Sequence, residues 1–193
     1  MNVRIALRVA VLALASALVA CGDSKEATTS AAKSAAPVGN IYEAVSAKAT
    51  GFTVGNMMAA RTVYVFFDAQ CPHCATLWQE SKPLLGQIRM VWAPVRLIGD
   101  LSGRQGAAIL AASDPAAEMD KHEKLRGTGS KGIDPPADVP KELTEKIRVN
   151  TELWTSIGGG AVPYMVFKDA ANGAPRAYEG AADTDGLRKL FGL

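Results

Sequence analysis

Four consecutive residues, Cys71, Pro72, His73 and Cys74, carry the chemistry that this sequence suggests most directly. Two cysteines separated by two residues can close a small ring, so the second thiol can release a partner that the first has attacked. We expect Cys71 to be the exposed attacking thiol. Cys74, one helical turn later, should be the resolving thiol that faces the interior. The four residues therefore predict a catalytic site for thiol:disulfide exchange.

The sequence around these residues predicts a helix that begins at Cys71. The preceding run, residues 63–67, is β-branched and aromatic, as in a buried parallel strand. Pro72 suits the first helical position because its φ is fixed and an N–H there would have no partner. Unpaired N–H groups at this end favour a thiolate on Cys71, and positive charge on His73 would stabilise it further. We expect the Cys71 pKa to lie well below about 8.5, the value of a free thiol.

Three other uses of the cysteine pair fit the sequence less well. A zinc site needs about four ligands, and the only other histidine, His122, lies about fifty residues away. Haem attachment would need a histidine directly after the second cysteine, where the chain has Ala75. A structural disulfide closing so short a loop would restrain little of the unfolded chain. We therefore expect no metal and no cofactor.

The first 20 residues have the features of a secretory signal peptide. They contain Arg4 and Arg8, no acidic residue, and then an apolar run. Export would place the dithiol in an oxidising compartment, where disulfides persist. Without Arg4 and Arg8 the 21 basic residues fall to 19, which equals the number of acidic residues. Such a balance predicts no nucleic-acid partner.

Residues 18–20, Leu-Val-Ala, stand directly before Cys21 and resemble the lipobox of bacterial lipoproteins. In such proteins the cysteine is acylated and becomes the mature N-terminus. The resemblance implies lipidation at Cys21 and a periplasmic protein anchored to a membrane, and Gly22 after the cysteine favours the outer membrane. An ordinary signal peptide followed by an unrelated cysteine is the alternative.

The rest of the chain divides into a tether and one domain. Residues 21–38 are mainly Ala, Ser, Thr and Lys, which predicts a flexible tether. Residues 39–193 suit a single domain with a sizeable core. Strands are expected at 52–54, 63–67, 90–98, 164–168 and 176–179, and helices at 41–48, 75–85, 102–112, 115–125, 141–157 and 184–191. This order predicts an α/β domain of the thioredoxin fold with a helical insertion at about 102–158.

Residues 41–193 resemble the catalytic domain of DsbC/DsbG-type thiol:disulfide interchange proteins, DsbG more than DsbC. The resemblance rests on Tyr64-Val65-Phe66-Phe67-Asp68 before the dithiol, Trp78-Gln79 and Pro83 after it, Ala108-Ile109-Leu110-Ala111 and Asp114-Pro115 in the insertion, and Val162-Pro163. In this family the proline before the third strand is cis and lies against the dithiol. This implies that Pro163 is cis and that Val162 presents backbone groups to an extended substrate. For Asp68 a structural or proton-handling role is implied, with a strand-end cap as the alternative.

The resemblance also implies partners. These are protein substrates with cysteines or disulfides, and a membrane redox partner that recycles the dithiol. Between Cys21 and the fold the sequence has only the tether and a short helix, where the family usually has a dimerisation domain, so we expect a monomer. Val162 and His73 match the monomeric oxidase DsbA at these positions.

Several functional alternatives stay open at this point. DsbG-like proteins reduce oxidised cysteines, including sulfenic acids, whereas a DsbA-like protein donates disulfides. A thiol metallochaperone using Cys71, Cys74 and His73 is an alternative of another class. A reductase for cytochrome maturation is a further one, which the long helical insertion disfavours.

Overall fold

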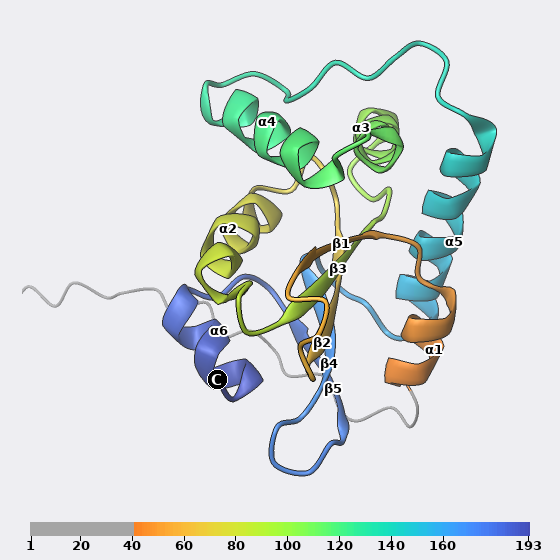
Figure 1. Cartoon of the computed structure of the whole chain (residues 1–193). Coiled ribbons are helices and arrows are strands. Elements are labelled where there is room, and N and C mark those ends of the chain that lie inside the picture. The colour runs from red at the N-terminus through yellow and green to blue at the C-terminus, as the bar shows by residue number, and fades with distance from the viewer. Residues whose placement is uncertain (1–40) are drawn as a thin grey trace, which may run out of the picture. The chain divides into compact units, whose positions relative to one another are not determined.

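The computed structural model describes residues 41–193, which are built around a five-stranded sheet (Figure 1). The strands are β1 (Phe52–Gly55), β2 (Thr62–Phe67), β3 (Arg89–Pro94), β4 (Tyr164–Lys168) and β5 (Pro175–Glu179), in the spatial order β1-β3-β2-β4-β5. β2 and β3 are parallel, and the other neighbours are antiparallel. The signal peptide, Cys21 and the tether predicted from the sequence lie outside the described residues.

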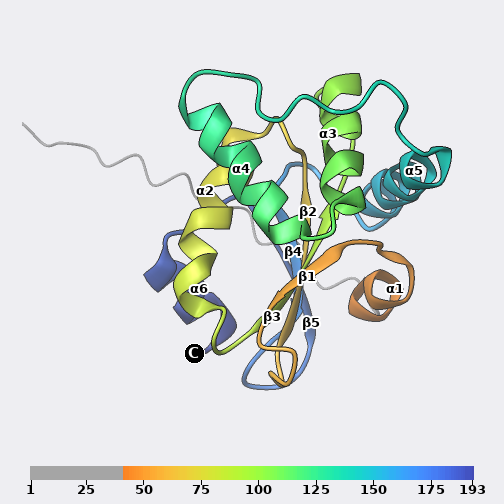
Figure 2. The same ribbon diagram turned by 45° about the horizontal axis from the view of Figure 1, so that its top comes forward.

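Helices cover both faces of this sheet (Figure 2). α2 (Pro72–Ser81) and α6 (Thr184–Phe191) lie on one face, and α1 (Ile41–Lys48) and α5 (Lys141–Ser156) lie on the other. α3 (Asp100–Ala111) packs against both α5 and α4 (Pro115–Gly127). None of the helices in this part of the chain is long and apolar enough to span a membrane. With three helices between β3 and β4, the predicted thioredoxin fold with a helical insertion is confirmed.

Alternate residues of β2 enter two separate cores. Val63, Val65 and Phe67 pack with apolar residues of α2 and α6, whereas Phe66 packs with those of α1 and α5. Successive side chains of a strand point to opposite faces, so an apolar run fits a strand covered on both sides. Because β2 is the central strand, its end places the start of α2 near the middle of the sheet edge. Cys71 lies four residues beyond the last residue of β2.

Two elements, α2 and β3, end earlier than the sequence predicts. α2 ends at Ser81 and is followed by a 3-10 turn, Lys82–Leu84, that contains Pro83, so the predicted extension of this helix to residue 85 is wrong. β3 ends at Pro94, so the predicted extension of this strand to Ile98 is wrong. The backbone N–H groups of Leu97 and Ile98 donate to the buried carboxylate of Asp68 instead of to a neighbouring strand.

Candidate active site

Cys71 is the N-cap residue of α2 and Pro72 is its first helical residue, as the sequence predicts. Cys71 has extended backbone angles, φ −80° and ψ 121°, and both Cys71 and Cys74 are free thiols. Cys74 is fully buried, and Cys71 is only 5% exposed. The expectation that Cys71 is exposed is therefore wrong. The Val162 carbonyl contacts the Cys71 sulfur, and the Arg126 side chain contacts the Cys71 carbonyl.

The segment before β4 closes one side of the dithiol. The Val162–Pro163 peptide bond is cis, as the family resemblance implies. The Cys71 Sγ atom donates a hydrogen bond to the Val162 carbonyl at 3.3 Å, although the two residues are 91 positions apart in the chain. Val162 is therefore placed beside the reactive sulfur. Its role in binding a substrate segment stays a prediction.

The pKa of Cys71 is lowered from 9.0 to about 6. The largest cause is the hydrogen bond that the Cys71 thiolate accepts from the Cys74 thiol. Burial opposes the shift, while the backbone N–H groups of Cys74 and His73 and the charge of His73 contribute to it. Burial raises the pKa of Cys74 well above 9.0, and the neighbouring Cys71 adds to this rise. The site therefore holds one thiolate and one thiol at neutral pH.

The ionisation of Cys71 gives a direct test of this arrangement. In the full chain carrying Cys21→Ala, the ultraviolet absorbance of the thiolate should rise with a midpoint near pH 6. Below the midpoint the thiol is protonated and alkylation should slow. Above it alkylation should reach a plateau. Cys74→Ala removes the largest cause of the shift and should move the midpoint upward. A midpoint near about 8.5, the free-thiol value, would contradict the assignment.

Asp68 is fully buried and accepts four hydrogen bonds at the end of β2. One carboxylate oxygen accepts from the backbone N–H of Gln70 at 2.8 Å. The other accepts from the backbone N–H groups of Leu97 and Ile98 at 2.8 and 3.0 Å, and from the Ser102 hydroxyl at 2.9 Å. A carboxylate with this many donors joins the segment before Cys71 to the start of α3. This geometry favours the strand-end cap for Asp68.

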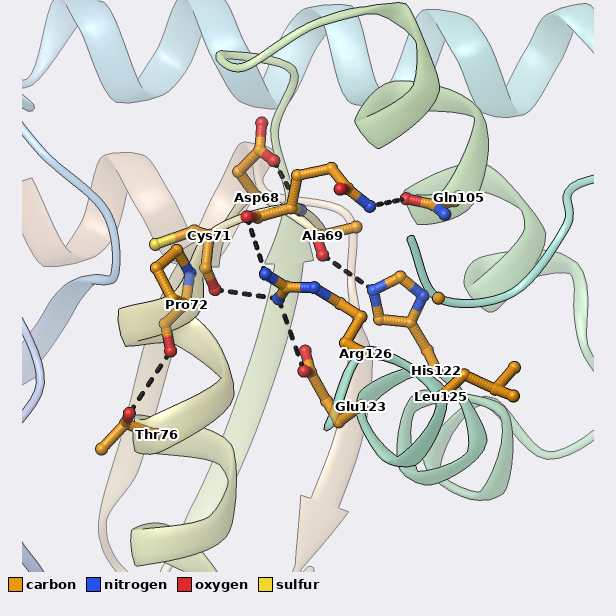
Figure 3. Close-up of polar contacts among 12 residues, drawn as sticks. Asp68, Ala69, Cys71, Pro72, Thr76, Gln105, His122, Glu123, Leu125 and Arg126 are labelled. Carbon is orange, nitrogen blue, oxygen red and sulfur yellow. Dashed lines mark hydrogen bonds and ion pairs between the residues drawn. The ribbon is translucent and has the colours of Figure 1, made fainter. Parts of the chain in front are cut away.

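The insertion brings to the dithiol a set of polar residues that the sequence did not identify (Figure 3). Arg126 of α4 donates to the carbonyl of Cys71 at 3.2 Å and to that of Gln70 at 2.9 Å. The buried Gln105 of α3 accepts from the side-chain amide of Gln70 at 2.5 Å. These contacts join residues 35 to 56 positions apart, so no local spacing marks them. The insertion thus holds the backbone on which Cys71 is mounted.

His122 of α4 also contacts the segment before α2, although its sequence neighbours are mostly charged. Its Nε2 donates to the Ala69 carbonyl at 2.7 Å, and its Nδ1 accepts from the backbone N–H of Ile133 at 3.3 Å. The two partners fit a neutral ring, and burial lowers the pKa of His122. Both ring nitrogens are thus used for structure. In the region from residue 41 onward, no group of three or more His, Cys, Asp and Glu side chains is placed to hold a metal ion.

The chain is similar to known proteins in both sequence and structure. A family model described as Thioredoxin matches residues 47–116. The thiol:disulfide interchange protein DsbG of Pseudomonas aeruginosa is 31% identical over 140 residues, which are 72% of this chain and 54% of that protein. DsbG of Escherichia coli is 29% identical over 140 residues, 72% of this chain and 55% of that protein. The chain thus spans about half the length of these relatives.

The fold is shared with solved structures of more distant sequence. A periplasmic thioredoxin-like protein from Salmonella enterica serovar Typhimurium superposes with a TM-score of 0.65 at 20% identity. The match covers 80% of this chain and 96% of that protein. At this identity the likeness supports the fold, while the resemblance to DsbG inferred from the sequence is confirmed by the two curated relatives.

Proposed function

We propose that the chain is a thioredoxin-like thiol:disulfide oxidoreductase related to DsbG, and that it acts through Cys71 and Cys74. The observation that carries the proposal is the unequal pair of thiols at the start of α2. Cys71 has a pKa of about 6, whereas Cys74 is buried and its pKa is raised. One sulfur is thus ready to attack, and the other stays protonated until it is needed.

The exchange reaction has two steps. The Cys71 thiolate attacks one sulfur of a client disulfide, which forms a mixed disulfide and releases the other client sulfur as a thiolate. Cys74 then loses its proton and attacks the Cys71 sulfur. This closes the Cys71–Cys74 disulfide and releases the second client thiolate. Two electrons pass from the chain to the client, and the reverse sequence donates a disulfide.

The Val162 carbonyl supports a role for the segment before β4 in holding clients. In the thiol state this carbonyl accepts from Cys71. Once Cys71 is ionised or bonded to a client, that acceptor is released and can bind a backbone N–H of an extended client segment. We propose that Val162 and Pro163 form the substrate-binding edge beside the dithiol.

Exchange with a defined client tests the proposal. The reduced full chain carrying Cys21→Ala is incubated with a peptide containing one disulfide, and the oxidised chain with the same peptide in its dithiol form. Exchange is expected in both directions until the same equilibrium is reached. Absence of exchange in both directions would contradict the proposed function.

The low pKa of Cys71 also favours a second candidate, donation of disulfides to clients. A stabilised thiolate makes the reduced form more stable and therefore the disulfide more oxidising. A reductant of oxidised cysteines should be found mainly reduced in intact cells, and a donor mainly oxidised. Thiol trapping in intact cells distinguishes the two.

We propose that the protein is exported to the periplasm and anchored by lipid at Cys21, with the outer membrane as its site. The support is the Leu-Val-Ala run directly before Cys21. Cys21→Ala is expected to abolish membrane association, because it removes the residue that would be acylated. The measurement is fractionation of cells followed by a high-salt wash. If Cys21→Ala stays with the membranes after the wash, the lipoprotein assignment is wrong.

We propose further that the chain acts as a monomer. α1, the helix nearest the start of the described residues, packs on its own sheet through the buried residues Ile41 and Val45. This face is therefore not free to pair with a second copy. Without two dithiols sharing one cleft, a client should leave after a single exchange. Sedimentation should give a monomer, and isomerisation of scrambled ribonuclease should be slow beside a dimeric isomerase. A stable dimer would contradict this proposal.

A further inference from the structure

Glu123 and Arg126 form an ion pair on α4, directly beside the start of α2 (Figure 3). The Arg126 Nη1 atom lies 3.5 Å from the Glu123 carboxylate and donates to the Cys71 carbonyl at 3.2 Å. The same guanidinium donates through Nη2 to the Gln70 carbonyl. Arg126 therefore fixes the position of the Glu123 carboxylate relative to the backbone of Cys71.

The Glu123 carboxylate is buried without a full set of partners. Its side chain is 3% exposed, and among residues 41–193 its Oε1 atom has no hydrogen-bond partner. A buried charged group with one unpaired oxygen is costly, and the cost falls when the group binds a proton. Burial raises the pKa of Glu123 to about 7, and the Arg126 charge opposes this rise. The charged and neutral forms are therefore close in free energy at neutral pH.

Among the groups around Glu123, Cys71 is the one whose charge changes with the redox state of the dithiol. From its own helix, Arg126 is the charged group that acts on it. From α2, the negative charge of Cys71 raises the Glu123 pKa. Four uncharged α2 residues line the groove that they share with Glu123: Pro72, Ala75, Thr76 and Gln79. Cys71 is charged as a free thiolate and uncharged in a disulfide, so the environment of Glu123 differs between the two redox states.

We propose that Glu123, held by Arg126, is a positioning residue that couples proton binding to the redox state of the dithiol. It binds a proton when the Cys71–Cys74 disulfide is reduced and releases it when the disulfide forms. The inference rests on the proposed thiol:disulfide exchange function. Its effect is to keep the charge of a largely buried site constant as the Cys71 thiolate appears and disappears.

Reduction of the site takes up two electrons and two protons. A dithiol donor supplies two electrons and breaks the Cys71–Cys74 bond. Cys71 becomes a thiolate and Cys74 takes one proton to become a thiol. The Glu123 carboxylate takes a second proton from solvent. Oxidation returns two electrons to a client disulfide and releases both protons. Above the pKa of Cys71 and below that of Cys74, the thiols alone account for one proton per two electrons.

The test is the pH dependence of the equilibrium between the chain and dithiothreitol, with and without the Glu123 charge. The full chain carrying Cys21→Ala is compared with the same chain carrying Glu123→Gln. Glu118→Gln, on the same helix and paired with Lys121, is the matched control. Near pH 7 the parent chain and the control should take up more than one proton per two electrons. Glu123→Gln should lose this excess. Equal pH dependence in all three proteins overturns the proposal.

Two further readouts cover the other outcomes. If the parent chain forms no Cys71–Cys74 disulfide, the proposed function itself fails. If Glu123→Gln does not fold, infrared spectroscopy of the parent chain tests the proposal without a variant at this position. The spectrum of the oxidised chain is subtracted from that of the reduced chain. A protonated-carboxyl band should appear on reduction. Its absence overturns the proposal while leaving disulfide exchange intact.

Discussion

Replacing Cys71 by serine is expected to abolish exchange with client disulfides. Cys71 is the only cysteine in the described region with a lowered pKa, and serine has no thiolate to attack with. Removal of a covalent nucleophile costs on the order of 10³-fold or more in rate. Cys74→Ser should behave differently. Attack by Cys71 still occurs, but resolution does not, so a mixed disulfide with the client should accumulate.

Non-reducing electrophoresis and mass spectrometry with a one-disulfide client peptide measure both effects. The chain carrying Cys21→Ala is the parent, and Ser46→Ala on α1, on the opposite face of the sheet, is a control that should exchange normally. The mixed disulfide should map to Cys71. If Cys71→Ser traps the client through Cys74, the two roles have been assigned the wrong way round.

Asp68→Ala is expected to destabilise the fold by about 3 kcal/mol or more. Asp68 is fully buried, and its loss leaves the backbone N–H groups of Gln70, Leu97 and Ile98 without an acceptor. The Ser102 hydroxyl can still donate to the Gly99 carbonyl. Each buried donor left unpaired costs about 1–3 kcal/mol, although relaxation and water reduce the sum. The loop between β3 and α3 should loosen with it, because Asp68 is its attachment to the segment before Cys71.

Urea unfolding of the two proteins measures this effect as a lower midpoint with an unchanged slope. Asp100→Ala is the matched control. Its carboxylate is 89% exposed and pairs with Arg96 on the surface, so its removal should cost less than about 1 kcal/mol. If Asp68→Ala is as stable as Asp100→Ala, the hydrogen bonds to Asp68 do not hold the loop.

The elements around the dithiol follow from local chemistry and could be predicted. Pro72 starts α2, since the first helical position needs no N–H. Asp114 caps α4 by accepting from the N–H of Ala117. β4 has the predicted bounds, because alternation and neighbouring turn residues define it. Such signals lie within a few residues of the structure they determine.

The surroundings of Cys71 could not be predicted, because they depend on residues distant in the chain. Cys71 is covered by Val162 and Arg126, which come from 91 and 55 positions away. His122 and Glu123 sit in a run of charged residues that is typical of an exposed helix face, yet both are buried. How the insertion packs on α2 decides their burial, and no periodic pattern in α4 records it.

The order of alkylation and oxidation of the two thiols tests the central claim most directly. The full chain carrying Cys21→Ala is equilibrated with reduced and oxidised glutathione, treated with limiting alkylating reagent, and digested for mass spectrometry. We predict that one reversible disulfide joins Cys71 to Cys74 and that, in the reduced chain, Cys71 is alkylated before Cys74. The absence of this disulfide, or alkylation of Cys74 first, would contradict the claim that these residues form an exchanging dithiol with Cys71 as the nucleophile.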